Sequence, residues 1–204
     1  MNDDIQCYKL VIVGDTNVGK THIFSIYNNL DYMKETTILA NYKSKKVKIS
    51  DGNGDEKFVK INMWDISGSD TYQSMVKTYY VGCHGIIFVF DLSNRQSFYN
   101  ITKWVERIND IIDLTTTIKI LIGNKSDRQH RVSNAEIHDL TVMHEMVYFE
   151  TTNTTRISIT NAFDHVVNEI VRRNCGNRHD SFVLRDDKER NSDVDKKSEC
   201  CVIS

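Results

Sequence analysis

The sequence contains no proline, and it has no apolar run long enough to cross a membrane as a helix. The absence of proline excludes no function. The longest apolar run, residues 85–90, has the length of a buried strand, whereas a transmembrane helix needs about 20 residues. Residues 1–4 lack the basic and then apolar layout of a signal peptide, so we expect no such peptide here.

An excess of basic charge is also missing, because 26 Lys and Arg residues stand against 28 Asp and Glu residues, for a net charge of −2. No global basic field therefore indicates nucleic-acid binding. Of the five cysteines, Cys7, Cys83 and Cys175 are scattered singly, with no pair at metal-ligand spacing. We expect neither a zinc site nor a disulfide framework, and we expect the reducing environment of the cytosol.

The composition that is present is that of a soluble globular protein, with 40% hydrophobic and 26% charged residues. A chain of 204 residues allows one domain of ordinary size and a tail. From about Asn174 to Glu199 the apolar pattern disappears, and the stretch holds six basic and seven acidic residues. We predict a domain over residues 1–173 and a flexible tail over residues 174–204.

Within the domain, short β-branched apolar runs alternate with segments of helical spacing. The expected strands are residues 8–13, 45–50, 58–64, 85–90, 118–122 and 147–149, and the expected helices are residues 20–30, 98–108, 133–143 and 157–172. Ser133 and Glu136 form a capping-box pattern. Asp51-Gly52-Asn53-Gly54-Asp55 suits the turn of an antiparallel hairpin. The alternation predicts an α/β fold, with a mostly parallel sheet covered on both faces.

The residues after the first expected strand fit the phosphate-binding pattern G-x-x-x-x-G-K-[ST] and open an expected helix, as the motif requires. They are Gly14, Asp15, Thr16, Asn17, Val18, Gly19, Lys20 and Thr21. Backbone N–H groups and the helix N-terminus would hold a phosphate, and Asn17 tolerates left-handed geometry. Lys20 would reach the β- and γ-phosphates, and the Thr21 hydroxyl would bind Mg²⁺. The alternative is a glycine turn that only joins strand to helix.

A polar loop, Asn124-Lys125-Ser126-Asp127, follows the expected strand at residues 118–122. Loops at the carboxyl ends of strands lie on the ligand-binding side of such folds. The Asp127 carboxylate could accept hydrogen bonds from N1–H and the 2-amino group of guanine, a pair of donors that adenine lacks. Lys125 could pack on the base, and Asn124 could tie this loop to the phosphate loop. By itself, the motif could equally be an ordinary polar loop.

A third loop, Trp64-Asp65-Ile66-Ser67-Gly68, closes the expected strand 58–64. Asp65 could hold the hydration shell of Mg²⁺, and the Gly68 N–H could meet a γ-phosphate. A simple strand exit with a capping Asp is the alternative for this loop alone. Three such loops at strand ends, in this order, favour a guanine-nucleotide site with Mg²⁺ and GTP or GDP as the ligand.

These motifs make the sequence resemble the Rab family of Ras-like small GTPases over roughly residues 7–173. Residues 77–87, KTYYVGCHGII, look like the Rab segment Y-Y-R-G-A-H-G-I-I, with Val81 and Cys83 departing from it, and residues 149–152, FETT, resemble the start of F-E-T-S-A-K. The resemblance implies a doubly wound, six-stranded sheet with one antiparallel hairpin strand. It also implies two switch loops that the γ-phosphate and Mg²⁺ hold.

The resemblance makes Ser69 a departure, because the family has a glutamine there that orients the attacking water. Asp70 also replaces a glutamate. A serine hydroxyl is too short to position water in the same way. We therefore predict slow GTP hydrolysis. The catalytic positions are Lys20, Gly68 and Ser69, which replaces the usual glutamine, and a GTPase-activating protein could supply the missing groups.

The first switch loop looks like the Rab segment S-T-I-G-V-D-F, with an interval after Thr21 about two residues shorter than in Rab proteins. Its effector-facing residues are Thr36, Thr37, Ile38, Leu39, Ala40, Asn41 and Tyr42, joined by Trp64. The resemblance makes Thr37 the Mg²⁺ ligand that senses the γ-phosphate, with Thr36 as the alternative. The role of Tyr32, beside the base or over the phosphates, stays open, and so does a plain polar loop.

The segment that resembles S-A-K reads Thr152-Asn153-Thr154, and we expect Thr152 and Asn153 to contact the base through the backbone. The last four residues, Cys201-Val202-Ile203-Ser204, fit the prenylation box C-a-a-X. Cys200 lies beside them as a second lipidation site, which suits the need for two signals in stable anchoring. Farnesyl or geranylgeranyl, on one or both cysteines, stays open.

The sequence thus predicts a monomeric GTP/GDP switch, anchored by lipid to the cytosolic face of an intracellular or plasma membrane, with a soluble cytosolic pool. The resemblance implies an exchange factor, a GTPase-activating protein, effectors in vesicle traffic and prenyltransferase machinery as partners. One alternative is a GTP-bound scaffold that scarcely turns over, which Ser69 motivates. Another is a P-loop kinase or ATPase, against which Asp127 argues.

Overall fold

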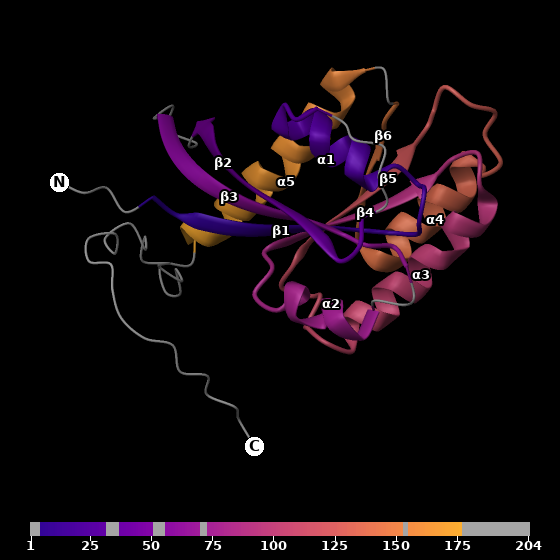
Figure 1. The fold of residues 1–204 in the computed structure, drawn as a ribbon, viewed down its shortest axis with the longest axis horizontal. Helices are drawn as coiled ribbons and strands as arrows, with labels where there is room; N and C mark the ends of the chain where they lie inside the picture. Colours follow the sequence, from indigo (N-terminus) through magenta and orange to yellow (C-terminus); the bar gives the residue numbers. More distant parts are fainter. Residues whose placement is uncertain (1–4, 32–36, 51–55, 70–72, 153–154, 177–204) are drawn as a thin grey trace, which may run out of the picture.

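The computed structural model describes residues 5–31, 37–50, 56–69, 73–152 and 155–176 of the chain (Figure 1). Its elements in chain order are β1 (Cys7–Val13), α1 (Lys20–Asn28), β2 (Ala40–Ser50), β3 (Glu56–Ile66), α2 (Gln73–Tyr80), β4 (Gly85–Asp91), α3 (Arg95–Asn109), β5 (Ile118–Asn124), α4 (Asn134–His144), β6 (Val147–Glu150) and α5 (Arg156–Gly176). None of the helices in the described ranges is both long and apolar enough to cross a bilayer.

The six strands form one sheet in the order β2-β3-β1-β4-β5-β6. All neighbouring strands run parallel except β2 and β3, which form an antiparallel hairpin. The predicted α/β fold with one antiparallel hairpin strand is therefore confirmed. The strand order reverses at β1, because β3 lies on one side of it and β4 on the other. Ligands bind at such a switch point, outside the carboxyl ends of the strands.

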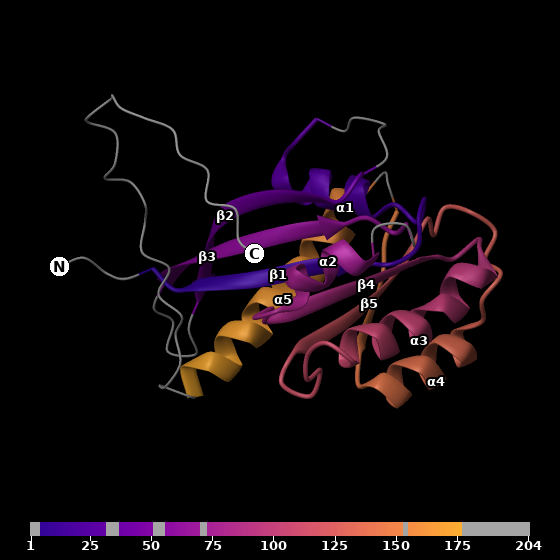
Figure 2. The same cartoon turned by 60° about the horizontal axis from the view of Figure 1, so that its bottom comes forward.

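Two apolar clusters fill the two sides of the sheet, as Figures 1 and 2 show. On one side, α1 and α5 pack through residues such as Phe24 and Phe163. On the other, α2, α3 and α4 pack through residues such as Val76, Phe98 and Leu140. Every residue of β4 is buried, as expected for a central strand covered on both faces.

Several element boundaries differ from the sequence prediction. Helix α1 ends at Asn28 instead of residue 30, because Asn29 adopts a left-handed conformation with φ of 56°. Strand β2 begins at Ala40, five residues before the predicted start, because pairing with β3 extends to Ala40↔Ile66. Helix α2 was missed. Helix α5 continues to Gly176, past the proposed domain boundary at residue 173.

One further local prediction is confirmed, and two others concern residues that the structure does not describe. The Ser133 and Glu136 capping box is present, since each side chain bonds the other residue's backbone N–H. The hairpin turn predicted at residues 51–55 lies outside the described residues, and so do residues 177–204 of the tail that was predicted over residues 174–204.

Candidate functional site

The phosphate loop of residues 14–21 joins the carboxyl end of β1 to α1. Three residues of this loop have positive φ: Gly14 at 140°, Asn17 at 64° and Gly19 at 102°. A Cβ on Gly14 would lie 2.1 Å from the Val89 carbonyl oxygen of β4, so only glycine fits there. Asn17 adopts the left-handed geometry that the sequence allowed.

Lys20 begins α1, and its ammonium is buried, with Nζ donating to the Asp15 carbonyl oxygen at 2.7 Å. Burial lowers the pKa of Lys20 to about 8, while the Asp65 and Asp15 carboxylates act to raise it. A buried ammonium with a lowered pKa lies in a site of low dielectric, where an anionic phosphate would favour its charged form.

Three oxygen-bearing side chains from separate segments meet beside the loop. Thr21 Oγ1 lies 2.7 Å from Asp65 Oδ2 and 2.9 Å from Thr37 Oγ1, and Thr37 Oγ1 lies 3.3 Å from the same carboxylate oxygen. The other oxygen, Asp65 Oδ1, is buried and has no hydrogen-bond partner among the described residues. Burial raises the pKa of Asp65, against hydrogen bonds from Thr21, Asn41 and Thr37 and the charge of Lys20.

This group of oxygens fits Mg²⁺, which prefers carboxylate and hydroxyl oxygens and keeps several waters. An unpartnered buried carboxylate oxygen is costly unless a cation or an ordered water pairs with it. The sequence predicted Thr21 and Thr37 as metal ligands and Asp65 as a residue that acts through the water bound to the ion, and the structure brings the three together. Thr36, the alternative ligand, lies outside the described residues, as does Tyr32.

Gly68 lies directly against the phosphate loop. A Cβ at this position would approach the Asp15 carbonyl carbon and the Thr16 nitrogen to 2.5 Å, so no larger residue fits without displacing backbone. Ser69, the next residue, is half-buried, and its backbone N–H donates to Ser67 Oγ at 3.4 Å. Asp70 lies outside the described residues.

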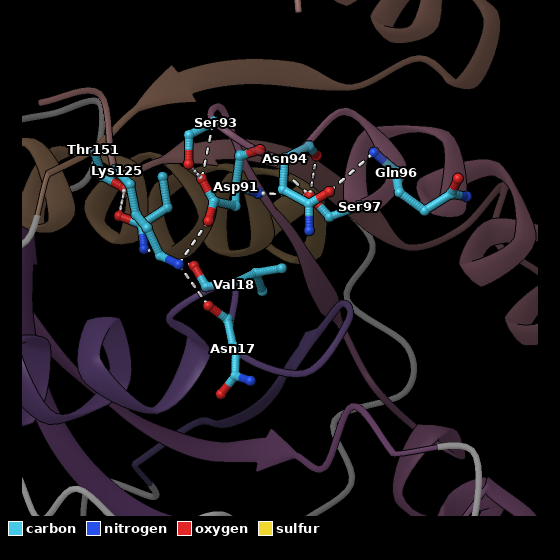
Figure 3. Close-up of polar contacts among 10 residues, drawn as sticks. Asn17, Val18, Asp91, Ser93, Asn94, Gln96, Ser97, Lys125 and Thr151 are labelled. Atoms are coloured by element: carbon cyan, nitrogen blue, oxygen red, sulfur yellow. Dashed lines mark hydrogen bonds and ion pairs between the residues drawn. The ribbon is translucent and has the colours of Figure 1, made fainter. Parts of the chain in front are cut away.

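The loop after β5 is bound to the phosphate loop by two side chains. Asn124, fully buried, donates from Nδ2 to the Val18 carbonyl at 2.8 Å, which is the link that the sequence suggested. Lys125 Nζ donates to the Asn17 carbonyl at 2.7 Å and pairs with Asp91 Oδ2 at 2.6 Å (Figure 3). Asp127 lies exposed beyond them. This arrangement fixes the loop that would read the base.

Thr151, the first residue after β6, supports the same loop. Its hydroxyl donates to Asn124 Oδ1 at 3.0 Å, and its carbonyl accepts from the Ser126 N–H at 3.1 Å. Thr152 follows, half-buried, while Asn153 and Thr154 lie outside the described residues. The three loops and the start of the S-A-K-like segment thus converge at one edge of the sheet.

Two parts of this site were not predicted from the sequence. Asp91, the partner of Lys125, ends β4, and the rule of polar residues at strand ends would have found it. The second is a link between Asp15 and α3: Asn100 Nδ2 donates to Asp15 Oδ2 at 2.7 Å, and Trp104 Nε1 donates to Asp15 Oδ1 at 2.9 Å. In the sequence, Trp104 was assigned only to the apolar face of its helix. Asn100 and Trp104 are four residues apart, so they lie on the same face of the helix and can contact one partner together.

We expect Trp104→Phe to speed nucleotide release about tenfold, because it removes a hydrogen bond to a charged group that fixes the phosphate loop. Because Trp104 is buried and phenylalanine is smaller, the melting temperature is measured as well, to report any loss of packing. Stopped-flow release of a fluorescent nucleotide measures the effect. Tyr99→Phe, on the exposed side of the same helix, is the control. Equal release rates for wild type and Trp104→Phe would show that the link does not hold the loop.

The residues of the first switch loop differ in their exposure and in their contacts. Tyr42 is exposed and lies beside Trp64, with 4.9 Å between ring centroids and a 3.0 Å bond from its hydroxyl to Asn62 Oδ1. Ile38 is exposed, and Leu39 and Ala40 are half-buried. Asn41 instead directs its amide toward Thr37 and Asp65. Ile38 and Tyr42 are thus exposed, and Leu39 and Ala40 pack partly against an apolar core cluster. Asn41 belongs to the site.

Comparison of the sequence with known proteins leads to the same class of protein as the geometry of the site. The sequence model of the Ras family matches residues 9–172, and the chain belongs to that family. It is 30% identical to Ras-related protein RABA1h of Arabidopsis thaliana over 81% of this chain and 75% of the relative. It is also 30% identical to Ras-related protein Rab-11B of Dictyostelium discoideum, over 91% and 84%. Ras-related protein Rab11D of Lotus japonicus is 32% identical over 81% and 75%.

The resemblance to Rab proteins is therefore confirmed, and the chain is a Rab-like small GTPase. Proteins of this family in general bind guanine nucleotide with Mg²⁺ and hydrolyse GTP.

Proposed function

We propose that this chain is a lipid-anchored, Rab-like GTP/GDP switch that recruits effectors in vesicle traffic and hydrolyses GTP slowly by itself. The observation that carries the proposal is the joining of Thr21, Thr37 and Asp65 by hydrogen bonds of 2.7–3.3 Å. These residues come from the phosphate loop, the first switch loop and the end of β3. A Mg²⁺ ion bound by them, together with a γ-phosphate, would order both switch loops at once.

The nucleotide roles follow from the same loops. The phosphate loop and Lys20 would hold the phosphates, and the loop with Asn124 and Lys125 would present Asp127 to guanine. The Gly68 N–H would contact the γ-phosphate. Bound Mg²⁺ would supply charge neutralisation between the β- and γ-phosphates. The chain's own residues would position the nucleotide.

Slow hydrolysis is supported by Ser69. Its side chain is too short to reach a water in line with the γ-phosphate and to contact that phosphate at the same time. A GTPase-activating protein would then provide the missing groups. A GTP-bound scaffold with little turnover is the second candidate, and the same serine favours it.

Membrane recruitment is proposed from Cys200 and Cys201, which lie outside the described residues. Two lipids would meet the requirement for two anchoring signals, since the tail carries no net positive charge. An exchange factor, effectors and prenyltransferase machinery would be the partners of a monomeric protein.

Hydrogen exchange tests the switch itself. Protein loaded with Mg²⁺ and a non-hydrolysable GTP analogue should show slower exchange at residues 37–42 and 65–69 than protein loaded with GDP. Residues 85–91 of β4, which are buried in both forms, are the internal control. Identical exchange in the two loaded forms would contradict a switch.

A further inference from the structure

Asn41 lies opposite Asp65 in the antiparallel pair of β2 and β3. Side chains opposite each other in such a pair lie on the same face of the sheet and within contact distance. Asn41 Nδ2 donates to Asp65 Oδ2 at 3.1 Å and to Thr37 Oγ1 at 3.2 Å. One amide therefore joins the two residues that connect the first switch loop to the candidate metal site.

The chemistry of the amide matters at this position. An amide nitrogen carries two donor hydrogens, so both bonds can form at the same time. An aspartate, which stands at the matching place of the Rab-like segment, would only accept and would put a second negative charge beside Asp65. Like charges opposite each other in a strand pair are destabilising. This chain thus has an attractive contact where a carboxylate would repel.

The geometry also separates Asn41 from the neighbouring residues of the switch. Tyr42, the next residue, points to the opposite face and lies beside Trp64. Asn41 is exposed as a whole residue, yet both partners of its amide lie at the candidate magnesium site. Its contacts close a ring with Thr37 and Asp65, in which Thr37 also bonds Asp65 directly.

We propose that Asn41 is a positioning residue of the magnesium site, whose amide holds Thr37 against Asp65 and favours the closed form of the first switch loop. The inference rests on the proposed nucleotide switch. A contact made only in the closed form shifts the balance between open and closed forms by its own free energy. Its loss should therefore weaken the GTP form, in which Thr37 is engaged, more than the GDP form.

The test uses the full chain and the variants Asn41→Ala and Asn41→Asp. Release of fluorescent GTP and GDP analogues is followed while Mg²⁺ is titrated from chelator to millimolar concentration. For Asn41→Ala we expect GTP release about tenfold faster, the size for loss of a hydrogen bond to a charged group, and GDP release within about twofold of wild type. Asn41→Asp should release GTP faster at low Mg²⁺ and approach wild type at millimolar Mg²⁺, because the cation neutralises the paired carboxylates.

Asn109→Ala and Asn109→Asp are the matched controls, because Asn109 is an exposed asparagine at the end of α3. Thr37→Ala supplies a second comparison: adding Asn41→Ala to it should not speed GTP release further if Asn41 acts through Thr37. A second readout needs no nucleotide. In nucleotide-free protein, Asn41→Ala should speed hydrogen exchange of residues 37–42 while leaving the melting temperature within about 2 °C of wild type.

The proposal is overturned if Asn41→Ala speeds GTP and GDP release equally, or if its full effect persists in the Thr37→Ala background. Failure of the underlying switch has a different signature. A wild-type chain that does not retain guanine nucleotide, or whose release ignores Mg²⁺, would remove the proposed function. The exchange result in nucleotide-free protein would still report on Asn41.

Discussion

Asp127→Asn is expected to lower GTP affinity on the order of 10³-fold, since it removes a carboxylate proposed to accept two charge-assisted hydrogen bonds from guanine. An amide would present an N–H₂ donor where the base also presents a donor. The same change should raise affinity for XTP, because xanthine carries a carbonyl at the position of the 2-amino group and can accept from that amide. A gain for one base with a loss for the other cannot come from general unfolding.

Competition binding with GTP, XTP and ATP measures this change of base preference from guanine to xanthine. Asp139→Asn, at an exposed position of α4, is the matched control and should leave all three affinities unchanged. If Asp127→Asn lowered GTP and XTP binding alike, Asp127 would not be reading the base. If it changed neither, the guanine assignment of this loop would be wrong.

Ser69→Gln should raise the single-turnover rate of GTP hydrolysis on the order of 10²-fold, at the low end for a positioned group that assists proton transfer. The longer amide can orient an attacking water and contact the γ-phosphate, which the serine hydroxyl cannot do together. Gly68 fixes the start of this segment against the phosphate loop, so the new side chain begins close to the reacting groups.

The variant Ser69→Ala tests whether the serine hydroxyl itself takes part in hydrolysis. It should hydrolyse GTP as slowly as wild type, because the hydroxyl is not expected to orient the water. A marked loss of rate in Ser69→Ala would show that the serine is itself catalytic. An unchanged rate in Ser69→Gln would place the slow step elsewhere.

Most of the fold could be predicted because its signals are local. Buried strands such as 85–90 are continuous apolar runs, and polar motifs directly follow them. The boundaries were harder, because they depend on partners far along the chain. Residues 40–44 of β2 carry mixed polar residues and become strand only through pairing with β3. From the sequence, residues 40–42 were instead assigned to the first switch loop.

The motifs of the site could be predicted from the sequence, but the long-range contacts that hold those motifs in place could not. Residues 14–21 and 124–127 have fixed spacings that chemistry dictates. The contacts of Asp15 with Trp104 and of Lys125 with Asp91 join residues 89 and 34 positions apart, which no local spacing indicates. Asn41 was assigned to the effector surface, because only the register of the hairpin places it opposite Asp65.

We propose that the chain retains guanine nucleotide with Mg²⁺ and hydrolyses GTP slowly. The most direct measurement loads wild-type protein from an equal mixture of GTP and ATP with Mg²⁺ and follows the retained nucleotide by chromatography over a single turnover. We predict that GTP alone is retained and that it converts to GDP much more slowly than in Ser69→Gln. Retention of ATP would show that the site does not select guanine, and conversion of GTP as fast as in that variant would show that Ser69 does not slow hydrolysis.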